Sequence, residues 1–301
     1  MPSLKLSVVA SALGSDPRKC ASLSRQAGFA GLLFDAYGPS LRMPDLSMTG
    51  RREFLRVLAG ENQQLAGLAG DIGSKGFGLG ADVDRLISGL DGAMEAARGL
   101  ASPLVCVDVG ALPEPQKLAK PRPPVTKSQA GLILLPESMM ETSDEPEGSG
   151  PPPDPKFVSQ VDGALSELGG RADRYGVVVA FRSDLASFAA IEAALGRARC
   201  PWFGVDLDPV AVLRDEWSRD EVFSRLGHLV RHVRGKDASK GAHRRTKSTV
   251  MGKGDAEWHE WIAALDDAGY IGWVTIDPVE LTDRAAGATA GLSLLRGLLD
   301  P

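Results

Sequence analysis

The chain has 301 residues, 43% of them hydrophobic, which is enough apolar material for one large domain core. Its formal net charge of -5 argues against a protein whose whole surface binds nucleic acid, so a basic role must be local. Cys20, Cys106 and Cys200 show no CxxC spacing, which predicts free thiols in a reducing compartment. The N-terminal apolar run is too short for a signal peptide or a membrane span, so we expect a cytoplasmic protein.

Short apolar segments alternate with amphipathic ones in the first part of the chain. Asp16 followed by Pro17 is typical of a helix start, and the glycines at 28 and 31 end that helix. The expected strands are residues 4–9, 32–34, 65–68 and 103–109, and the expected helices are residues 17–27, 51–58 and a segment opened by Asp82.

A proline-rich segment, residues 111–156, interrupts this alternation. It holds 11 of the 20 prolines and has a basic first half and an acidic second half. A connection of this length inside a compact domain is either functional or disordered. We predict an irregular insertion after the fourth strand that crosses the barrel face, with the apolar segment 131–135 docked on the body.

The alternation resumes after the insertion. The expected strands are residues 177–181, 202–207, 229–233 and 272–276, and the expected helices include residues 158–168, 258–265, segments capped by Ser183 and by Asp208, and a final helix through residue 299. Eight strands alternating with helices predict a single α/β domain, residues 1–301, with a (β/α)8 TIM barrel fold. A doubly wound open sheet is the alternative, although no GxGxxG or GxxxxGK[ST] motif is present.

A basic segment follows the seventh expected strand. Between Arg231 and Lys253 there are eight Lys or Arg residues and one acidic residue, Asp237. Loops at this place in a barrel often hold phosphate, so the segment is a candidate anion site, with Lys236 the side chain best placed to reach inward. The alternative is a solvated run of charge.

Charged residues also follow most of the expected strands, at the barrel end where such folds carry chemistry. They are Asp35, Asp71, Asp108, Arg182, Asp206, Asp208, Arg234, Lys236, Asp237 and Asp277. A metal site built from oxygen ligands would need several converging carboxylates, whereas two of the later strands end in arginine.

Four motifs resemble the xylose-isomerase-like TIM barrel superfamily. They are GFAG at 28–31, VRGKD at 233–237, GKGD at 252–255 and GYIGWVTID at 269–277. The resemblance covers nearly the whole chain apart from the insertion. It implies sugar (phosphate) isomerase or epimerase chemistry, or that of endonuclease IV type nucleases, with a divalent metal held by Glu, Asp, His and Glu after strands five to eight.

This chain lacks most of the metal ligands that the resemblance implies. Arg182 stands at the glutamate position after strand five, Arg234 at the histidine position after strand seven, and Asp277 at the final glutamate position. Only the strand-six aspartate is retained, as Asp208 or, as the second choice, Asp206. Because arginine cannot bind a cation, we expect a degenerate metal site in which Arg182 and Arg234 pair with Asp208 and Asp277.

The sequence thus predicts a barrel that binds a small anionic sugar-like ligand through Arg182, Arg234, Lys236 and Asp237. Asp208 and Asp277 are the expected proton-transfer residues, and no cofactor is expected. The alternatives are a non-catalytic barrel that binds a ligand or a protein, a metal-dependent isomerase, and a nuclease, which the missing zinc ligands disfavour.

His232 is expected to be a solvated residue beside its strand and His259 a peripheral one. A second copy of the chain is a further candidate partner.

Overall fold

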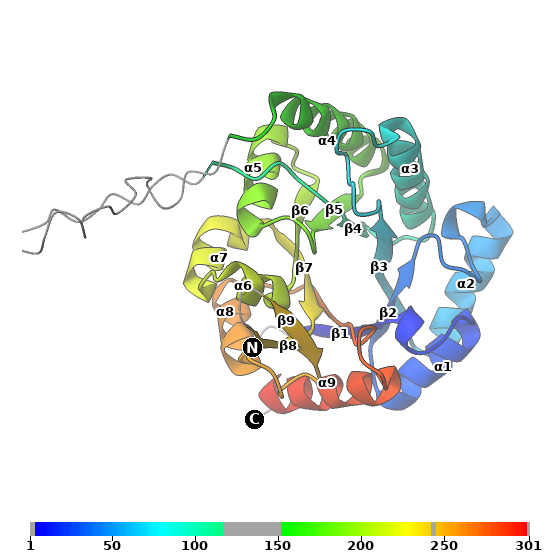
Figure 1. Ribbon diagram of the computed structural model, residues 1–301. Helices are drawn as coiled ribbons and strands as arrows, with labels where there is room; N and C mark the ends of the chain where they lie inside the picture. The colour runs from blue at the N-terminus through cyan, green and yellow to red at the C-terminus, as the bar shows by residue number, and fades with distance from the viewer. Residues whose placement is uncertain (1–3, 117–151, 242–244, 300–301) are drawn as a thin grey trace, which may run out of the picture.

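Eight parallel strands close into a barrel ringed by helices in the described part of the chain, a computed structural model covering residues 4–116, 152–241 and 245–299 (Figure 1). Around the barrel the order is β1, β10, β7, β6, β5, β4, β3 and β2, which closes back onto β1. The strands are β1 (Lys5–Val9), β2 (Gly31–Asp35), β3 (Gln64–Asp71), β4 (Leu104–Asp108), β5 (Val178–Arg182), β6 (Phe203–Leu207), β7 (Val230–Gly235) and β10 (Trp273–Ile276). The expected (β/α)8 barrel is confirmed over the open sheet.

Helices cover the outside of the barrel (Figure 1). They are α1 (Pro17–Ala27), α2 (Met48–Gly60), α3 (Val83–Gly99), α4 (Pro155–Tyr175), α5 (Phe188–Ala198), α6 (Pro209–Asp215), α7 (Arg219–Leu226), α8 (Trp258–Asp267) and α9 (Arg284–Leu299). The carboxylates of Asp16, Asp82 and Asp208 accept backbone N–H groups at the starts of α1, α3 and α6, as their position before each helix predicts. No helix among the described residues is long and apolar enough to span a bilayer.

Ser183 is not the N-cap of α5, contrary to the sequence prediction. The helix begins at Phe188, and Ser187 caps it by accepting the N–H of Ala190. The Ser183 hydroxyl instead donates to the carbonyl of Gly110 at 2.6 Å and so fastens the end of β5 to the end of β4. This difference matters because the turn after β5 lies beside the candidate site.

The long interruption falls between β4 and α4, as predicted. Pro155 and Lys156 already belong to α4, so the expected boundary of 111–156 runs slightly into the helix. Residues 117–151 lie outside the described part of the chain, and the prediction that segment 131–135 docks on the body lies there too.

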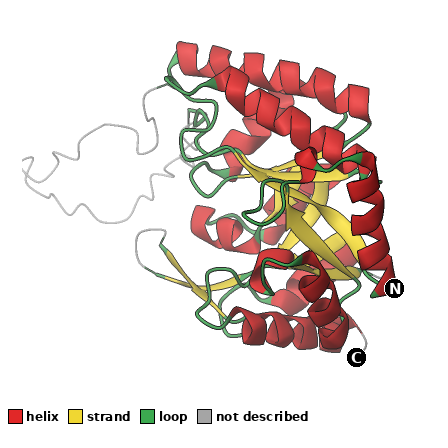
Figure 2. Cartoon of the chain, turned by 90° about the vertical axis from the view of Figure 1, so that its right-hand side faces the viewer, coloured by secondary structure: helices red, strands yellow, loops and turns green. Residues whose placement is uncertain are grey.

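The basic segment after β7 forms a hairpin rather than the expected loop. Strands β8 (Asp237–Lys240) and β9 (Thr246–Thr249) pair antiparallel, and Figure 2 shows them projecting away from the barrel. These short strands consist mostly of Asp, Lys, Ser and Thr residues, so no alternating apolar pattern marks them in the sequence.

The barrel strands are almost wholly buried and mostly apolar, as parallel strands covered on both faces should be. All three cysteines are free, and Cys20 and Cys106 are buried, as expected. Five buried polar residues depart from the apolar pattern inside four neighbouring strands: Ser7, Asp206, His232, Arg234 and Thr275. These exceptions lead directly to the candidate site.

Candidate functional site

A cavity of about 480 Å³ opens at the carboxyl ends of the barrel strands. Its volume suits a small molecule, for which pockets of roughly 300–1,000 Å³ are usual. The charged groups that line it come from five strands or the turns after them: Asp35, Asp71, Arg182, Asp184, Arg234, Lys236, Asp277 and Glu280.

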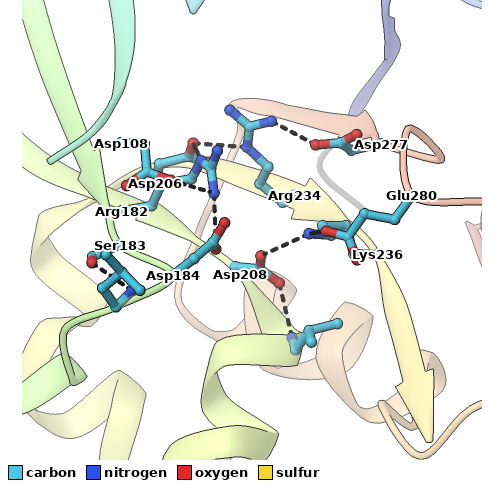
Figure 3. Close-up of polar contacts among 12 residues, drawn as sticks. Asp108, Arg182, Ser183, Asp184, Asp206, Asp208, Arg234, Lys236, Asp277 and Glu280 are labelled. Carbon is cyan, nitrogen blue, oxygen red and sulfur yellow. Dashed lines mark hydrogen bonds and ion pairs between the residues drawn. The ribbon is translucent and has the colours of Figure 1, made fainter. Parts of the chain in front are cut away.

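Arg234 lies at the centre of this constellation, on β7 (Figure 3). Its Nε donates to Oδ2 of Asp206 at 2.9 Å, and its Nη1 donates to Oδ2 of Asp277 at 2.7 Å. Burial alone would lower the pKa of Arg234, but the two carboxylates raise it well above its ordinary value. The guanidinium is therefore a fixed cation, and its Nη2 has no hydrogen-bond partner among the described residues, although the side chain lines the cavity.

Asp206, which accepts the Nε hydrogen of Arg234, is itself fully buried. Burial alone would raise the pKa of Asp206, but Arg234 and His232 lower it well below its ordinary range. The carboxylate stays ionised for that reason. Sequence reasoning ranked Asp208 above Asp206 as the strand-six residue, whereas the structure brings Asp206 to the centre.

His232 is completely buried, so its interpretation as a solvated residue is wrong. Its Nδ1 lies 2.6 Å from Oδ1 of Asp206, and its Nε2 lies 2.6 Å from the hydroxyl of Thr275. That hydroxyl in turn lies 2.7 Å from the hydroxyl of Ser7. His259, by contrast, is 67% exposed on α8 and peripheral, as expected.

Arg182 forms a second cationic group, at the end of β5. Its Nη1 lies 3.2 Å from Oδ2 of Asp108 and 3.0 Å from Oδ1 of Asp184 (Figure 3). Burial and the neighbouring Arg234 oppose the charge of Arg182, but these carboxylates leave its pKa raised overall. The expected pairs of arginine with Asp277 and Asp208 are thus only half present: Arg234 pairs with Asp277, and neither arginine pairs with Asp208 among the contacts of the described residues.

Lys236 is the partner of Asp208 instead. Its Nζ lies 3.8 Å from Oδ2 of Asp208 and 2.6 Å from Oε1 of Glu280. Burial alone would lower the pKa of Lys236, but these carboxylates raise it above its ordinary value. Glu280 also accepts the hydroxyl of Ser248 on β9, so the hairpin is tied to the rim of the cavity through one carboxylate.

Asp237, predicted to contact the ligand, has its carboxylate occupied by the backbone. It accepts N–H groups from Gly252, Gly254 and Ala256 at 2.8 to 3.2 Å and is 3% exposed. A Cβ on Gly254 would come within 2.2 Å of this carboxylate, so the close approach requires glycine there. The motif at 252–255 therefore organises the loop around Asp237 and does not face the 480 Å³ cavity.

The side of the cavity formed by β2 and β3 differs in having carboxylates without cationic partners. Asp35 makes no side-chain hydrogen bond or ion pair to any described residue, although it lines the cavity. Partial burial raises its pKa, Arg234 opposes that shift, and Asp277 adds to it. The sequence placed Asp35 at a strand end but gave no signal that it would lack a partner.

The residues at the strand ends do not fit a dication. Arg182 and Arg234 stand where the resemblance implies ligands, and a metal between them would face two guanidinium groups. Deeper in the barrel, potential ligand atoms of Cys106, Asp206 and His232 lie within 4.8 Å of one another. Their geometry is that of a hydrogen-bonded cluster, because Nδ1 and Oδ1 are 2.6 Å apart and the other Asp206 oxygen binds Arg234.

Comparison with known proteins shows the same architecture. The family model described as a xylose isomerase-like TIM barrel matches residues 21–298. A D-psicose 3-epimerase from Clostridium cellulolyticum H10 superposes with a TM-score of 0.69 at 14% identity, covering 99% of this chain and 100% of the other. A xylose isomerase domain protein from Planctomyces limnophilus gives 0.68 at 15% identity, covering 98% and 95%. A probable 3-DHS dehydratase of petrobactin synthesis from Bacillus anthracis gives 0.67 at 12% identity, covering 97% and 99%. No curated protein sequence matches the chain.

Proposed function

The chain belongs to the xylose isomerase-like TIM barrel family, and from this premise we propose that it binds an uncharged sugar and moves a proton on the carbon beside the sugar carbonyl. This is the chemistry of a sugar isomerase or epimerase. The observation that carries the proposal is Arg234, a fixed cation between Asp206 and Asp277 whose Nη2 is left for a ligand in a cavity of about 480 Å³.

The charge balance favours an uncharged polyol over the anionic sugar that the sequence indicated. Five carboxylates and three cations line the cavity, and each of the three cations is already paired with carboxylates of the protein. A phosphate would add negative charge to an acidic site. Sugar hydroxyls suit it better, because they donate to carboxylates and accept from N–H groups. A related barrel, the D-psicose 3-epimerase, was solved with the unphosphorylated sugar D-tagatose.

Arg234 and Asp35 have the properties that proton transfer beside a carbonyl requires. A donor fixed at the carbonyl oxygen stabilises the negative charge that develops when the proton leaves, and Nη2 of Arg234 is such a donor. The base must have a free carboxylate with a raised pKa, and Asp35 has both. Asp277 is held by Arg234, and Asp208 caps α6 outside the cavity lining, so we assign the base to Asp35 instead.

Arg182 and Lys236 complete the site as groups that orient the ligand. Each lines the cavity and is held by two carboxylates, so each presents a donor in a fixed position. No step of this scheme uses a metal ion, because the guanidinium of Arg234 supplies the positive charge at the reacting carbonyl.

A non-catalytic sugar-binding protein is the second candidate function. It is favoured by the engagement of most carboxylates near the cavity: Asp108, Asp206, Asp208 and Asp277 all form ion pairs. The two candidates share the ligand and differ in whether a carbon-bound proton exchanges with solvent.

Titration calorimetry on metal-stripped protein tests the ligand class. We expect D-fructose, D-tagatose or D-allulose to bind more tightly than the matching ketose phosphate at low salt. Arg234→Lys keeps the charge but removes the planar two-sided donor, so it should weaken ketose binding at least about tenfold. The surface variant His259→Ala is the control and should bind as the wild type does. Tighter binding of the ketose phosphate than of the ketose contradicts the proposal. Folded protein that binds neither compound also contradicts it.

A further inference from the structure

We propose that His232, which does not line the cavity, is a positioning residue that fixes the position of Arg234. Only the expected effect on ligand binding rests on the proposed function. The structural part of the proposal is a buried hydrogen-bond relay, which does not depend on that function. That relay runs from β1 to the cavity in one continuous line: Ser7, Thr275, His232, Asp206, Arg234 and Asp277.

The relay lies in the barrel interior. The Sγ of Cys106, on β4, lies within 4.8 Å of a ring nitrogen of His232, on β7, and these strands are separated in the barrel by β5 and β6. Side chains of strands that are not neighbours can come this close only inside the barrel. The strand register places Asp206 opposite His232 and Thr275 opposite Arg234, so neighbouring strands bring the groups together without any loop.

The hydrogen bonds of the relay have one consistent direction. The carboxylate of Asp206 can only accept, so Nδ1 of His232 must donate to it. With Nδ1 carrying the proton, Nε2 of a neutral ring accepts the hydroxyl of Thr275, and Thr275 accepts the hydroxyl of Ser7. The donors of Ser7, Thr275 and His232 are then all used. A doubly protonated ring would turn the Thr275 hydroxyl toward Ser7 and leave the buried Ser7 hydroxyl without an acceptor, which is unfavourable.

His232 therefore acts on Arg234 through Asp206. One oxygen of this carboxylate takes the histidine N–H at 2.6 Å and the other takes Nε of Arg234 at 2.9 Å. The histidine fixes the plane of the carboxylate, and the carboxylate fixes the guanidinium whose Nη2 remains for the ligand. At metal sites, removing a group that orients a ligand typically changes affinity or activity about 10–100-fold, and we expect a change of the same order here.

Two amide substitutions separate this role from packing. Asparagine places its N–H close to the position of Nδ1, whereas glutamine reaches the position of Nε2. His232→Asn should keep the protected Nε–H signal of Arg234 in nitrogen-15 NMR and a ketose affinity close to that of the wild type. His232→Gln should lose that protection and bind ketose at least about tenfold more weakly. Val233→Ala, a buried position on the same strand, controls for lost packing and should retain the signal.

The wild-type protein alone gives an independent measurement. Nitrogen-15 shifts of selectively labelled histidine should show Nδ1 protonated and Nε2 unprotonated in His232. The opposite tautomer overturns the relay, as does identical behaviour of the asparagine and glutamine variants in the Arg234 signal. If the Arg234 signal follows the relay but no ketose binds the wild type, the relay stands and the proposed function falls.

Discussion

The two sides of the cavity are built on different principles. On the side of β5, β6, β7 and β10, here called the paired side, Arg182, Arg234 and Lys236 are each held by two or more carboxylates. On the side of β2 and β3, the unpaired side, Asp35 lines the cavity with no ion pair among the described residues. The contrast teaches that fixed charge and a titrating carboxylate are kept apart, since a carboxylate locked beside arginine cannot easily take up a proton.

Removing Arg234 should break the paired side most severely. Arg234→Met leaves Asp206 and Asp277 buried without their cation, which we expect to destabilise the protein by about 3–5 kcal/mol. Urea unfolding followed by circular dichroism measures the change. A loss below about 1 kcal/mol would show that the ion pairs are not the structural centre of the site.

Asp35→Asn tests the unpaired side. Unlike Arg234→Met, it should reduce activity without reducing stability. Because Asp35 lacks an ion-pair partner and burial raises its pKa, its neutral analogue should be at least as stable as the wild type at neutral pH. Exchange of the carbon-bound proton of a bound ketose with deuterated solvent should fall by about 10²-fold or more. Asp71→Asn, which alters a neighbouring carboxylate on β3, is the matched control. Unchanged exchange in Asp35→Asn would remove Asp35 from the mechanism.

The contributions of Asp277 and Asp35 to stability should change with pH in opposite directions. The folded-state pKa of Asp277 is lowered, so its stabilising contribution is present above its ordinary pKa and is lost as pH falls through the folded value. The folded-state pKa of Asp35 is raised, so its contribution is present below its ordinary pKa and is lost as pH rises through the folded value.

Unfolding free energies of Asp35→Asn and Asp277→Asn, each compared with the wild type at several acidic pH values, measure these contributions. The disadvantage of Asp277→Asn should shrink as pH falls. The stability of Asp35→Asn relative to the wild type should rise as pH increases. Slopes of the same sign for both variants would mean that the two carboxylates do not differ in the way described.

The smallest expected effect concerns the hairpin link. Glu280→Gln weakens the hold on Lys236, but the Glu280 side chain is 52% exposed, so solvent screening limits the loss to about 0.2–1 kcal/mol. Glu53→Gln, which removes exposed ion pairs with Arg18 and Arg56, is the comparison and should fall in the same range. The distinguishing result is ketose affinity, which we expect to decrease only in Glu280→Gln.

Local sequence signals were sufficient for most of the fold. Asp16 with Pro17, and Asp208 with Pro209, predicted helix starts that the structure confirms, because capping depends on neighbours in the chain. The β8–β9 hairpin was missed, since its charged and hydroxyl residues carry no apolar alternation. Ser183 was mistaken for a helix cap for a similar reason: it bonds nearby N–H groups in a turn that is not helical.

The site was less predictable because it depends on strand register. Asp206 and Asp208 are two residues apart, yet the first ends inside the barrel and the second caps a helix. His232 and Arg234 are two residues apart on β7 and therefore face the same side, but Arg231 beside them is also polar, so the sequence does not show a clean alternation. Which strand lies beside which, and therefore which aspartate meets Arg234, is tertiary information that one sequence does not contain.

Deuterium exchange into a ketose by metal-stripped wild-type protein tests the central claim most directly. The claim is that Arg234 supplies the positive charge at the carbonyl and Asp35 receives the proton, with no divalent ion. We predict that a bound ketose gains deuterium beside its carbonyl in the presence of a chelator, and that adding Mn²⁺ does not increase the rate. Exchange that appears only when Mn²⁺ is added would contradict the account.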